Sequence, residues 1–325
     1  MMQKNRNIIL QALADGQFRS GTELGELAGV TRTAVAKHVD ALKALGLDIF
    51  SVRGKGYKLA QPINLLVVDK IQAAFQQRSG VAYPASMHVV PLIDSTNTYI
   101  KDHLYNLESG AICTAESQSA GRGRQGRTWV SPFASSIYLS MYWRFAGGYQ
   151  TLSGLSLVVG LAVADALDDL GISGVQLKWP NDIYVNMQKI AGILIEIEGS
   201  VGDEVDCVIG LGVNVQLPEN VDTIDQPFTD CVTQLGQRVD RNTLIANILY
   251  YLHQSLNTFS LHGMLPFKEQ WERRDAFFHK PVILLAGQNS ISGIGMGIGE
   301  TGALLLQVDG EIKAFHGGEI SVRAG

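Results

Sequence analysis

The 325-residue sequence lacks most of the residue patterns that indicate a covalent or metal-based site. Its three cysteines, Cys113, Cys207 and Cys231, form no C-x-x-C pair, so neither a zinc site nor a disulfide framework is expected. The histidines show no metal-binding spacing, and no G-x-S-x-G motif or Cys/His set indicates a nucleophile. We therefore expect no protein-bound metal and a reducing, cytoplasmic compartment.

The sequence also has no N-terminal apolar segment typical of a signal peptide. Its most apolar run, residues 152–167, is interrupted by Ser153, Ser156 and Asp165. Such a run is interpreted as a buried helix rather than a membrane span. No membrane partner is expected.

Charge is unevenly distributed along the chain. The net charge is −5, yet residues 1–62 contain nine Lys/Arg and five Asp/Glu, a balance of +4, which leaves −9 for the remainder. A small basic module on an acidic body indicates that one end meets a polyanion.

The first 62 residues have the pattern of a winged helix-turn-helix. Apolar spacing predicts helices over residues 6–14, 21–28 and 32–45, with Leu24, Leu27 and Ala28 facing inward in the second, and Ser20 with Glu23 forms a capping box. Strands 47–52 and 57–59 with a basic turn predict the wing. The predicted DNA contacts are Thr22, Arg32, Thr33, Lys37, Lys43, Arg53 and Lys55. The alternative is a helical packing module that binds no DNA.

The remainder reads as two further domains. Predicted helices 64–78, 98–105, 151–170 and 241–259 alternate with predicted strands 87–93, 111–116, 136–143, 175–178, 183–185, 191–198 and 205–211. This mixture indicates an α+β domain with a mixed or antiparallel sheet. Short strands at 282–285, 290–298, 303–308, 311–315 and 318–322 predict a small β-barrel. The expected domains are 1–62, 63–274 and 275–325.

Residues 121–129, called the arginine loop below, alternate glycine with arginine. Gly121, Gly123 and Gly126 allow a close backbone approach, and the intervening arginines offer charged forks for phosphate or carboxylate. The G-x-G-x-x-G match is not a dinucleotide fingerprint, because the β-branched and Pro-broken stretch 128–132 starts no helix. The loop therefore suits an anionic ligand, and a plain mobile surface loop is the alternative.

Two further features are ambiguous from the sequence alone. Residues 94–97 could simply cap the helix that follows, or could direct hydroxyl groups and a helix N-terminus at a polar ligand. Lys189 lies beside an apolar strand and could be either solvated or functional.

Taken together, the motifs resemble those of the bifunctional biotin–protein ligases and biotin operon repressors of bacteria. They are Asp94-Ser95-Thr96-Asn97, Gln118, Gly121-Arg122-Gly123-Arg124-Gln125-Gly126-Arg127, Lys178-Trp179-Pro180-Asn181-Asp182, Lys189-Ile190-Ala191-Gly192-Ile193-Leu194-Ile195-Glu196 and Gly210-Leu211-Gly212-Val213-Asn214. The resemblance spans the whole chain. It departs at Gln125, where relatives often carry arginine.

The resemblance implies a class II synthetase-like centre, an SH3-like terminal barrel and a two-step reaction. Biotin and ATP, with Mg²⁺, would give biotinyl-5′-adenylate, and a lysine of the biotin carboxyl carrier protein would then accept the biotin. The adenylate would also act as corepressor, favouring a homodimer that binds operator DNA.

The resemblance also implies roles for individual residues. The catalytic set is Arg122, Arg124, Lys189 and Asp182. The biotin-binding set is Ser95, Thr96, Asn97, Gln118, Gly121, Arg122, Gly123, Arg124 and Lys189. The nucleotide-binding set is Arg124, Arg127, Asn181, Asn214 and Arg323. Trp129 would either shield the pocket or be an ordinary core residue.

Three other functions fit parts of the sequence. A ligase without a regulatory role would not need residues 1–62. A lipoate-type ligase would not be expected to combine this loop with a winged module. A ligand-sensing repressor without ligase activity gives no reason for Lys189 and the motif at residues 178–182.

Overall fold

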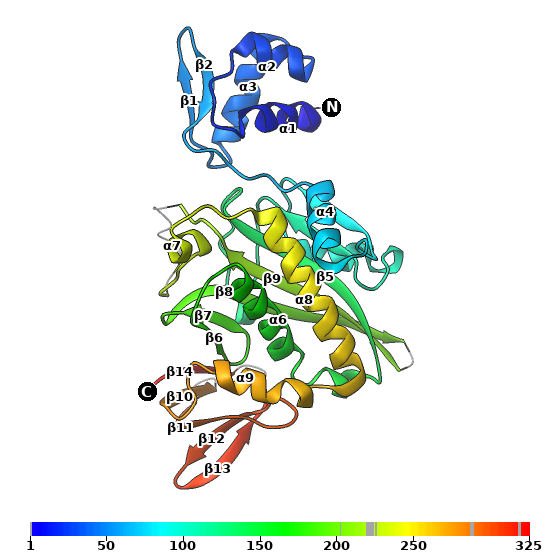
Figure 1. Cartoon of the computed structure of the whole chain (residues 1–325), viewed down its shortest axis with the longest axis vertical. Coiled ribbons are helices and arrows are strands. Elements are labelled where there is room, and N and C mark those ends of the chain that lie inside the picture. The colour runs from blue at the N-terminus through cyan, green and yellow to red at the C-terminus, as the bar shows by residue number, and fades with distance from the viewer. Residues whose placement is uncertain (1, 202, 219–223, 225, 287–288, 318–319) are drawn as a thin grey trace.

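The computed structural model describes residues 2–325 apart from 202, 219–223, 225, 287–288 and 318–319 (Figure 1). Its strands form three sheets: a two-stranded hairpin, a central seven-stranded sheet and a five-stranded sheet near the C-terminus. In Figure 1 these follow one another down the long axis of the molecule.

The N-terminal module has the predicted helices and wing. It comprises α1 (Met2–Leu13), α2 (Gly21–Ala28), α3 (Arg32–Lys43), β1 (Ile49–Val52) and β2 (Gly56–Leu59). Ser20 accepts a hydrogen bond from the Glu23 N–H, as its predicted cap requires. One prediction was wrong: Leu27 is 55% exposed. Leu24 and Ala28, one helical turn apart, fill the inner face, so Leu27 lies on the flank.

A hydrogen-bonded linker joins this module to the central part. The Ile63 N–H donates to Ala14 O (2.9 Å), and the Leu66 N–H donates to Glu116 Oε1 (2.6 Å). Glu116 also forms a fully buried ion pair with Arg241 (2.6 Å). Because residues 64–67 have no regular secondary structure, α4 (Val68–Ser79) begins four residues later than predicted.

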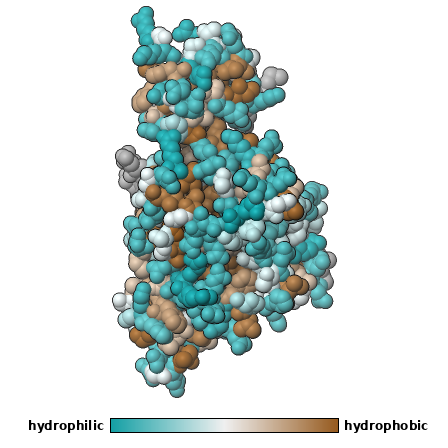
Figure 2. Space-filling view, in the orientation of Figure 1, coloured by the Kyte–Doolittle hydropathy of each residue, from teal (hydrophilic) through white to brown (hydrophobic). Residues whose placement is uncertain are grey.

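Apolar residues also cross the junction. Phe133 belongs to the same buried cluster as the core of the N-terminal module. Figure 2 shows hydrophobic residues gathered at this neck. The segment that follows the arginine loop therefore packs beneath the winged module.

The central sheet is mixed, as predicted, with the order β3-β4-β5-β9-β8-β7-β6. Strands β3 and β4 pair in parallel, and the other neighbours pair antiparallel. The strands are β3 (Met87–Val90), β4 (Ile112–Ala115), β5 (Ser136–Ala146), β6 (Val175–Lys178), β7 (Asp182–Val185), β8 (Gln188–Val201) and β9 (Glu204–Asn214).

Helices cover both faces of this sheet. Helices α4, α6 (Leu155–Asp169) and α8 (Arg241–His262) pack on one face, where Ile112 and Met141 join the main core. On the other face, Cys113 and Tyr142 pack against α5 (Thr96–His103), as the period of two along a strand requires. Helix α6 and the turn before it are apolar enough to span a membrane, but 61% of the most apolar 18-residue stretch is buried inside the fold. It is a core helix, as predicted.

Some helices begin at other residues than predicted, and some short elements were not predicted. Helix α5 begins at Thr96, two residues early, because Ser95 provides the N-cap. Helix α6 begins at Leu155, after a 3₁₀ turn. The elements not predicted are α7 (Cys231–Leu235), α9 (Lys268–Arg274) and the 3₁₀ turns η1 (Leu104–Asn106), η2 (Arg124–Gly126), η3 (Tyr149–Leu152) and η4 (Leu265–Phe267).

The C-terminal strands form an antiparallel sheet with the order β13-β12-β11-β10-β14. They are β10 (Pro281–Ala286), β11 (Asn289–Ile298), β12 (Leu304–Val308), β13 (Glu311–Phe315) and β14 (Ile320–Ala324). Strands β13 and β14 lie at opposite edges, so the described residues do not close the predicted barrel. The first two residues of the predicted strand 318–322 lie outside the described part. The sheet is tied to the centre where the Trp179 indole N–H donates to Gly302 O (3.1 Å).

Candidate functional site

One cleft of about 1060 Å³ lies where the strand ends β7, β8 and β9, the start of α5, the arginine loop and β14 converge. Segments from residue 95 to residue 324 contribute to its walls. The cleft thus brings most of the motifs found in the sequence into one place.

The start of α5 and Gln118 form a polar floor at one end. Gln118 Oε1 accepts hydrogen bonds from the Thr96 N–H (2.9 Å) and from Thr96 Oγ1 (3.2 Å). Ser140 Oγ lies 2.7 Å from Thr96 Oγ1. Ser95 caps the helix through its contact with the Thr98 N–H and also lines the cleft. The cap is therefore confirmed, and because it faces the cleft, the expectation that these residues bind a polar ligand stays a prediction.

Asn97 lies deeper on the same floor. Its Nδ2 donates to Glu196 Oε2 (2.7 Å), and its Oδ1 lies within hydrogen-bond distance of Ser140 Oγ. A side chain at Gly210 would overlap Asn97 Oδ1, so the glycine leaves room for the amide.

The arginine loop is folded into a flap over the cleft. The Trp129 N–H donates to Gly121 O (2.9 Å), and the Gly123 N–H donates to Arg127 O (2.7 Å). No helix starts at residues 128–132, as predicted, and Arg124–Gly126 just before them form a 3₁₀ turn. Gln125 and Gly126 have φ values of 57° and 71°, a conformation that glycine adopts without strain.

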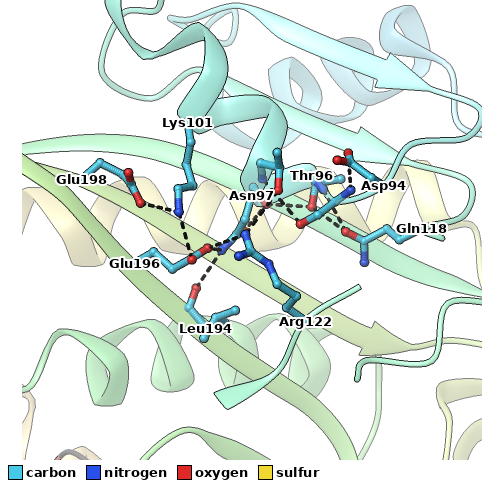
Figure 3. Close-up of polar contacts among 12 residues, drawn as sticks. Asp94, Thr96, Asn97, Lys101, Gln118, Arg122, Leu194, Glu196 and Glu198 are labelled. Atoms are coloured by element: carbon cyan, nitrogen blue, oxygen red, sulfur yellow. Dashed lines mark hydrogen bonds and ion pairs between the residues drawn. The ribbon is translucent and has the colours of Figure 1, made fainter. Parts of the chain in front are cut away.

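The arginines of this loop point to different places. Arg122 Nη2 contacts Thr98 Oγ1 (3.3 Å) and Glu196 Oε2 (3.2 Å), at the α5 end (Figure 3). Arg124 Nη1 donates to Asn181 Oδ1 (3.0 Å), at the opposite end. Burial lowers the pKa of Arg124, which the nearby Asp182 carboxylate partly offsets. Arg127 is exposed on the rim.

A cluster of cations marks the β6–β7 end of the cleft. Lys189 Nζ pairs with Asp182 Oδ1 (2.7 Å), and Lys178 Nζ donates to Tyr184 Oη (2.9 Å). Burial lowers the pKa of Lys178, and the positive charges of Lys189 and Arg323 act in the same direction. Burial also raises the pKa of Tyr184 to about 12. Such a surplus of positive charge suits a polyphosphate.

Lys178 and Tyr184 were absent from the predicted site sets. Lys178 opens the motif at residues 178–182, and Tyr184 follows Asp182 by two residues on the same strand. The period of two would have placed Tyr184 on the face of Asp182.

Trp129 packs flat against glycines. An added Cβ at Gly212 would overlap its ring, and one at Gly192 would lie 2.9 Å from it. Lys189 Nζ is 5.4 Å from the ring centroid. The tryptophan is therefore a wall of the cleft rather than an ordinary core residue.

Most of the predicted ligand-binding residues line this cleft. They are Ser95, Thr96, Asn97, Gln118, Arg122, Gly123, Arg124, Arg127, Asn181, Asp182, Lys189, Asn214 and Arg323. Gly121 lies behind the wall, where a side chain would meet Trp129 O and Ser131 Oγ. Asn214 Nδ2 donates to Thr229 O (3.0 Å) and so braces the wall.

The predicted DNA-contact residues lie apart from the cleft. Thr22, Arg32, Thr33, Lys37, Lys43, Arg53 and Lys55 are all exposed on α2, α3 and the wing. In the described part of the chain, no group of three or more His, Cys, Asp and Glu residues could hold a metal ion.

Comparison with known proteins accounts for the combination of this cleft with a winged module. Residues 89–214 match the biotin/lipoate A/B protein ligase family, residues 5–58 match an HTH domain and residues 278–323 match the biotin protein ligase C-terminal domain. The bifunctional ligase/repressor BirA of Salmonella typhimurium is 45% identical over 97% of both chains. That of Escherichia coli is 43% identical over 97% of this chain and 96% of its own.

A solved structure agrees. The biotin protein ligase of Aquifex aeolicus in complex with biotin and ATP superposes with a TM-score of 0.66 and 29% identity, covering 74% of this chain and 99% of its own. The chain therefore belongs to the biotin protein ligase family, among the bifunctional ligase/repressors, and the resemblance read from its motifs is confirmed.

Proposed function

We propose that this protein is an AMP-forming biotin–protein ligase that also represses transcription, with biotinyl-5′-adenylate as both intermediate and corepressor. The observation that carries this proposal is that a polar floor and a cationic end meet in one cleft beneath the arginine loop. The exposed basic side chains of the winged module supply the second activity.

In the first step, the biotin carboxylate attacks the α-phosphate of ATP and pyrophosphate leaves. Ser95, Thr96 and Gln118 would bind the polar ureido end of biotin. Arg124 and Lys189 would neutralise charge where the carboxylate meets the phosphate, since preorganised cations stabilise charge that develops in the transition state. No enzyme nucleophile is needed.

The phosphates would lie among Lys178, Lys189, Arg127 and Arg323. Of the described residues that line the cleft, Asp182 alone carries a carboxylate. Asp182 and Asn181 would therefore hold Mg²⁺ together with phosphate oxygens. The ion would supply further neutralisation of phosphate charge.

In the second step, the acceptor lysine of the biotin carboxyl carrier protein attacks the mixed anhydride. An amide forms and AMP leaves. Asp182 and Asn181, which line the cleft where β7 begins, would orient that amine or the phosphate it displaces. Until then the arginine loop would retain the adenylate.

We further propose that the adenylate-bound protein forms a homodimer that binds a two-fold operator. Residues Ala191–Val201 of β8 pair with β9, whereas the ladder of β8 with β7 ends at Gly192 and the Ile193 N–H still donates to Asn181 O (3.0 Å). Beyond Ile193, no strand pairs with this edge in the described structure, and it carries Ile197, which is 44% exposed. An open edge of this kind is a template for a second copy of the strand.

Within this proposal, residues 1–62 bind DNA, 63–274 catalyse the reaction and 275–325 complete the nucleotide end of the cleft. The protein would act in the cytoplasm without a membrane partner. The class II synthetase-like centre and the SH3-like terminal domain stay predictions.

One experiment tests both activities. The full-length protein is incubated with Mg²⁺, ATP, labelled biotin and a carrier domain, with a carrier whose acceptor lysine is replaced by arginine as control. We expect label on the first carrier only, and no transfer when lipoate replaces biotin. Absence of transfer would leave a ligand-sensing repressor, and transfer of lipoate would indicate the other ligase class.

The same mixtures, without carrier, are then tested for DNA binding. A mobility-shift assay on DNA upstream of biotin-synthesis genes should show tighter binding with biotin and ATP together than with either alone, because ligand and DNA binding are linked. Sedimentation that finds a monomer both with and without adenylate would refute the dimer.

A further inference from the structure

Glu196 on β8 lies just beyond the end of the cleft, where it connects its strand to α5 and to the arginine loop. Its Oε2 accepts hydrogen bonds from Asn97 Nδ2 (2.7 Å) on α5 and from Arg122 Nη2 (3.2 Å) in the arginine loop. Its Oε1 accepts one from Lys101 Nζ (3.2 Å). Figure 3 shows the three donors converging on this carboxylate. None of the site roles above includes it.

The contact with Glu196 changes what Arg122 can do. Its guanidinium faces a carboxylate of the protein rather than the cationic end of the cleft. Its side chain is 43% exposed, whereas that of Glu196 is 21% exposed, so the flexible partner belongs to the loop and the fixed partner to the sheet. Arg124, two residues on, is tied to Asn181 at the other end.

The contact with Asn97 fixes the orientation of an amide on the floor. Because a carboxylate only accepts hydrogen bonds, the Asn97 NH₂ group must face Glu196 and its oxygen must face Ser140. Ser140 in turn contacts Thr96, which donates to Gln118. The carboxylate therefore stands at one end of a hydrogen-bond chain that runs along the predicted ureido-binding floor.

We propose that Glu196 is a positioning residue for the ligase reaction, holding the arginine loop closed through Arg122 and orienting Asn97 toward biotin. Arg122 then acts as a latch to the sheet rather than as a direct ligand of biotin. This inference rests on the proposed ligase function. It assigns the retention of the adenylate to two anchors, Arg122–Glu196 at one end and Arg124–Asn181 at the other.

Glu198 provides a matched control. It lies two residues along the same strand and pairs with the same lysine, Lys101 Nζ (2.6 Å), but contacts neither Arg122 nor Asn97 in the described structure. Glu196→Gln and Glu198→Gln each remove one carboxylate charge of this cluster, and only the first removes the latch.

The test compares Glu196→Gln, Arg122→Ala, the double variant and Glu198→Gln with the parent. We expect Glu196→Gln to release free adenylate roughly tenfold faster and to raise the KM for biotin by a similar factor, with kcat for adenylation little changed. Loss of one charge-assisted contact corresponds to about that factor. Glu198→Gln should match the parent.

Non-additivity identifies the latch. If Glu196 acts through Arg122, the double variant should release adenylate no more than about twofold faster than Arg122→Ala. If the fold increases in adenylate release of the two single variants multiply in the double variant, the latch is overturned. It is also overturned if Glu196→Gln or Arg122→Ala releases adenylate at the parental rate. Far-ultraviolet circular dichroism checks folding, and Arg122→Ala provides the test if Glu196→Gln does not fold.

A second readout does not depend on catalysis. Trypsin should cleave the arginine loop several-fold faster in Glu196→Gln than in Glu198→Gln, without any ligand, because an unlatched loop opens more often. Equal cleavage would overturn the inference whatever the chemistry. If the parent makes no adenylate but the two variants still differ in trypsin cleavage, the ligase proposal is refuted and the latch is retained.

Discussion

Nζ of Lys189 lies 2.7 Å from Oδ1 of Asp182, joining the two strands that border the cationic end of the cleft. The side chain of Lys189 is only 14% exposed, which excludes the alternative of a solvated lysine. A ligand carboxylate or phosphate that enters would compete with Asp182 for this ammonium. The pair thus compensates a buried charge in the absence of a ligand.

Replacing Lys189 with alanine should weaken biotin binding by roughly 10- to 100-fold, the cost of losing one charge-assisted hydrogen bond. Titration calorimetry with biotin measures it. Lys189→Met, which keeps most of the apolar stem and removes the charge, should give a similar loss. An unchanged dissociation constant in both variants would contradict the assigned role.

Replacing Arg124 with glycine should let the adenylate escape. The Arg124–Asn181 bond ties the arginine loop to the cationic end of the cleft, and its loss should yield free adenylate and biotin on non-cognate lysines of bystander proteins. Gln125→Gly is the control for loop flexibility, since Gln125 has φ 57° and glycine there relieves strain. Retention by Arg124→Gly equal to that of the parent would show that the clamp is misassigned.

Replacing Gly212 with alanine should displace Trp129. The added methyl would overlap the indole, and such overpacking typically costs about 1–3 kcal/mol in stability. We expect weaker biotin binding and a shifted tryptophan emission spectrum, with helix content preserved. The matched change Gly236→Ala, at a helix end with nothing within 4 Å of the added Cβ, should leave binding unaffected.

Stability should fall in acid because of His253. Its ring packs edge-on against Tyr83 and Trp143, its Nε2 has no hydrogen-bond partner in the described structure, and burial lowers its pKa from 6.5 to about 4. Protonation therefore favours the unfolded chain. The contribution is complete above about pH 6.5 and is lost as the pH falls through about 4, up to about 3 kcal/mol.

The change His253→Phe should remove this dependence. Free energies of unfolding in urea at pH 7.5 and pH 5 should then differ less in the variant than in the parent. An equal difference in both proteins would assign the acid sensitivity to other groups.

Local features of the fold were readable because they depend on neighbours in sequence. The cap at Ser20, the 3.6-residue periodicity of α3 and the basic turn at residues 53–56 predicted the winged module. The glycine and arginine content of residues 121–127 indicated an anion-binding loop. The prediction that Leu27 faces inward was wrong, because the apolar pattern of one short helix does not show which of its flanks the neighbouring helices cover.

The tertiary structure decided which side chains the arginines of the loop contact. Arg122 lies 74 residues from Glu196 in sequence, and Arg124 lies 57 residues from Asn181. Which of them meet depends on the register of β8 against β7, including the irregularity between Ile183 and Tyr184. A shift of one residue would turn every side chain of the strand to the other face.

The sequence by itself thus predicted the class of ligand, because glycine and arginine carry their backbone freedom and charge wherever they lie. Only the tertiary structure decided that one arginine reaches a carboxylate and the next an amide, because strand register and helix packing set those distances. It also placed Phe133, just beyond the arginine loop, in the core of the winged module. No local periodicity shows a contact of that kind.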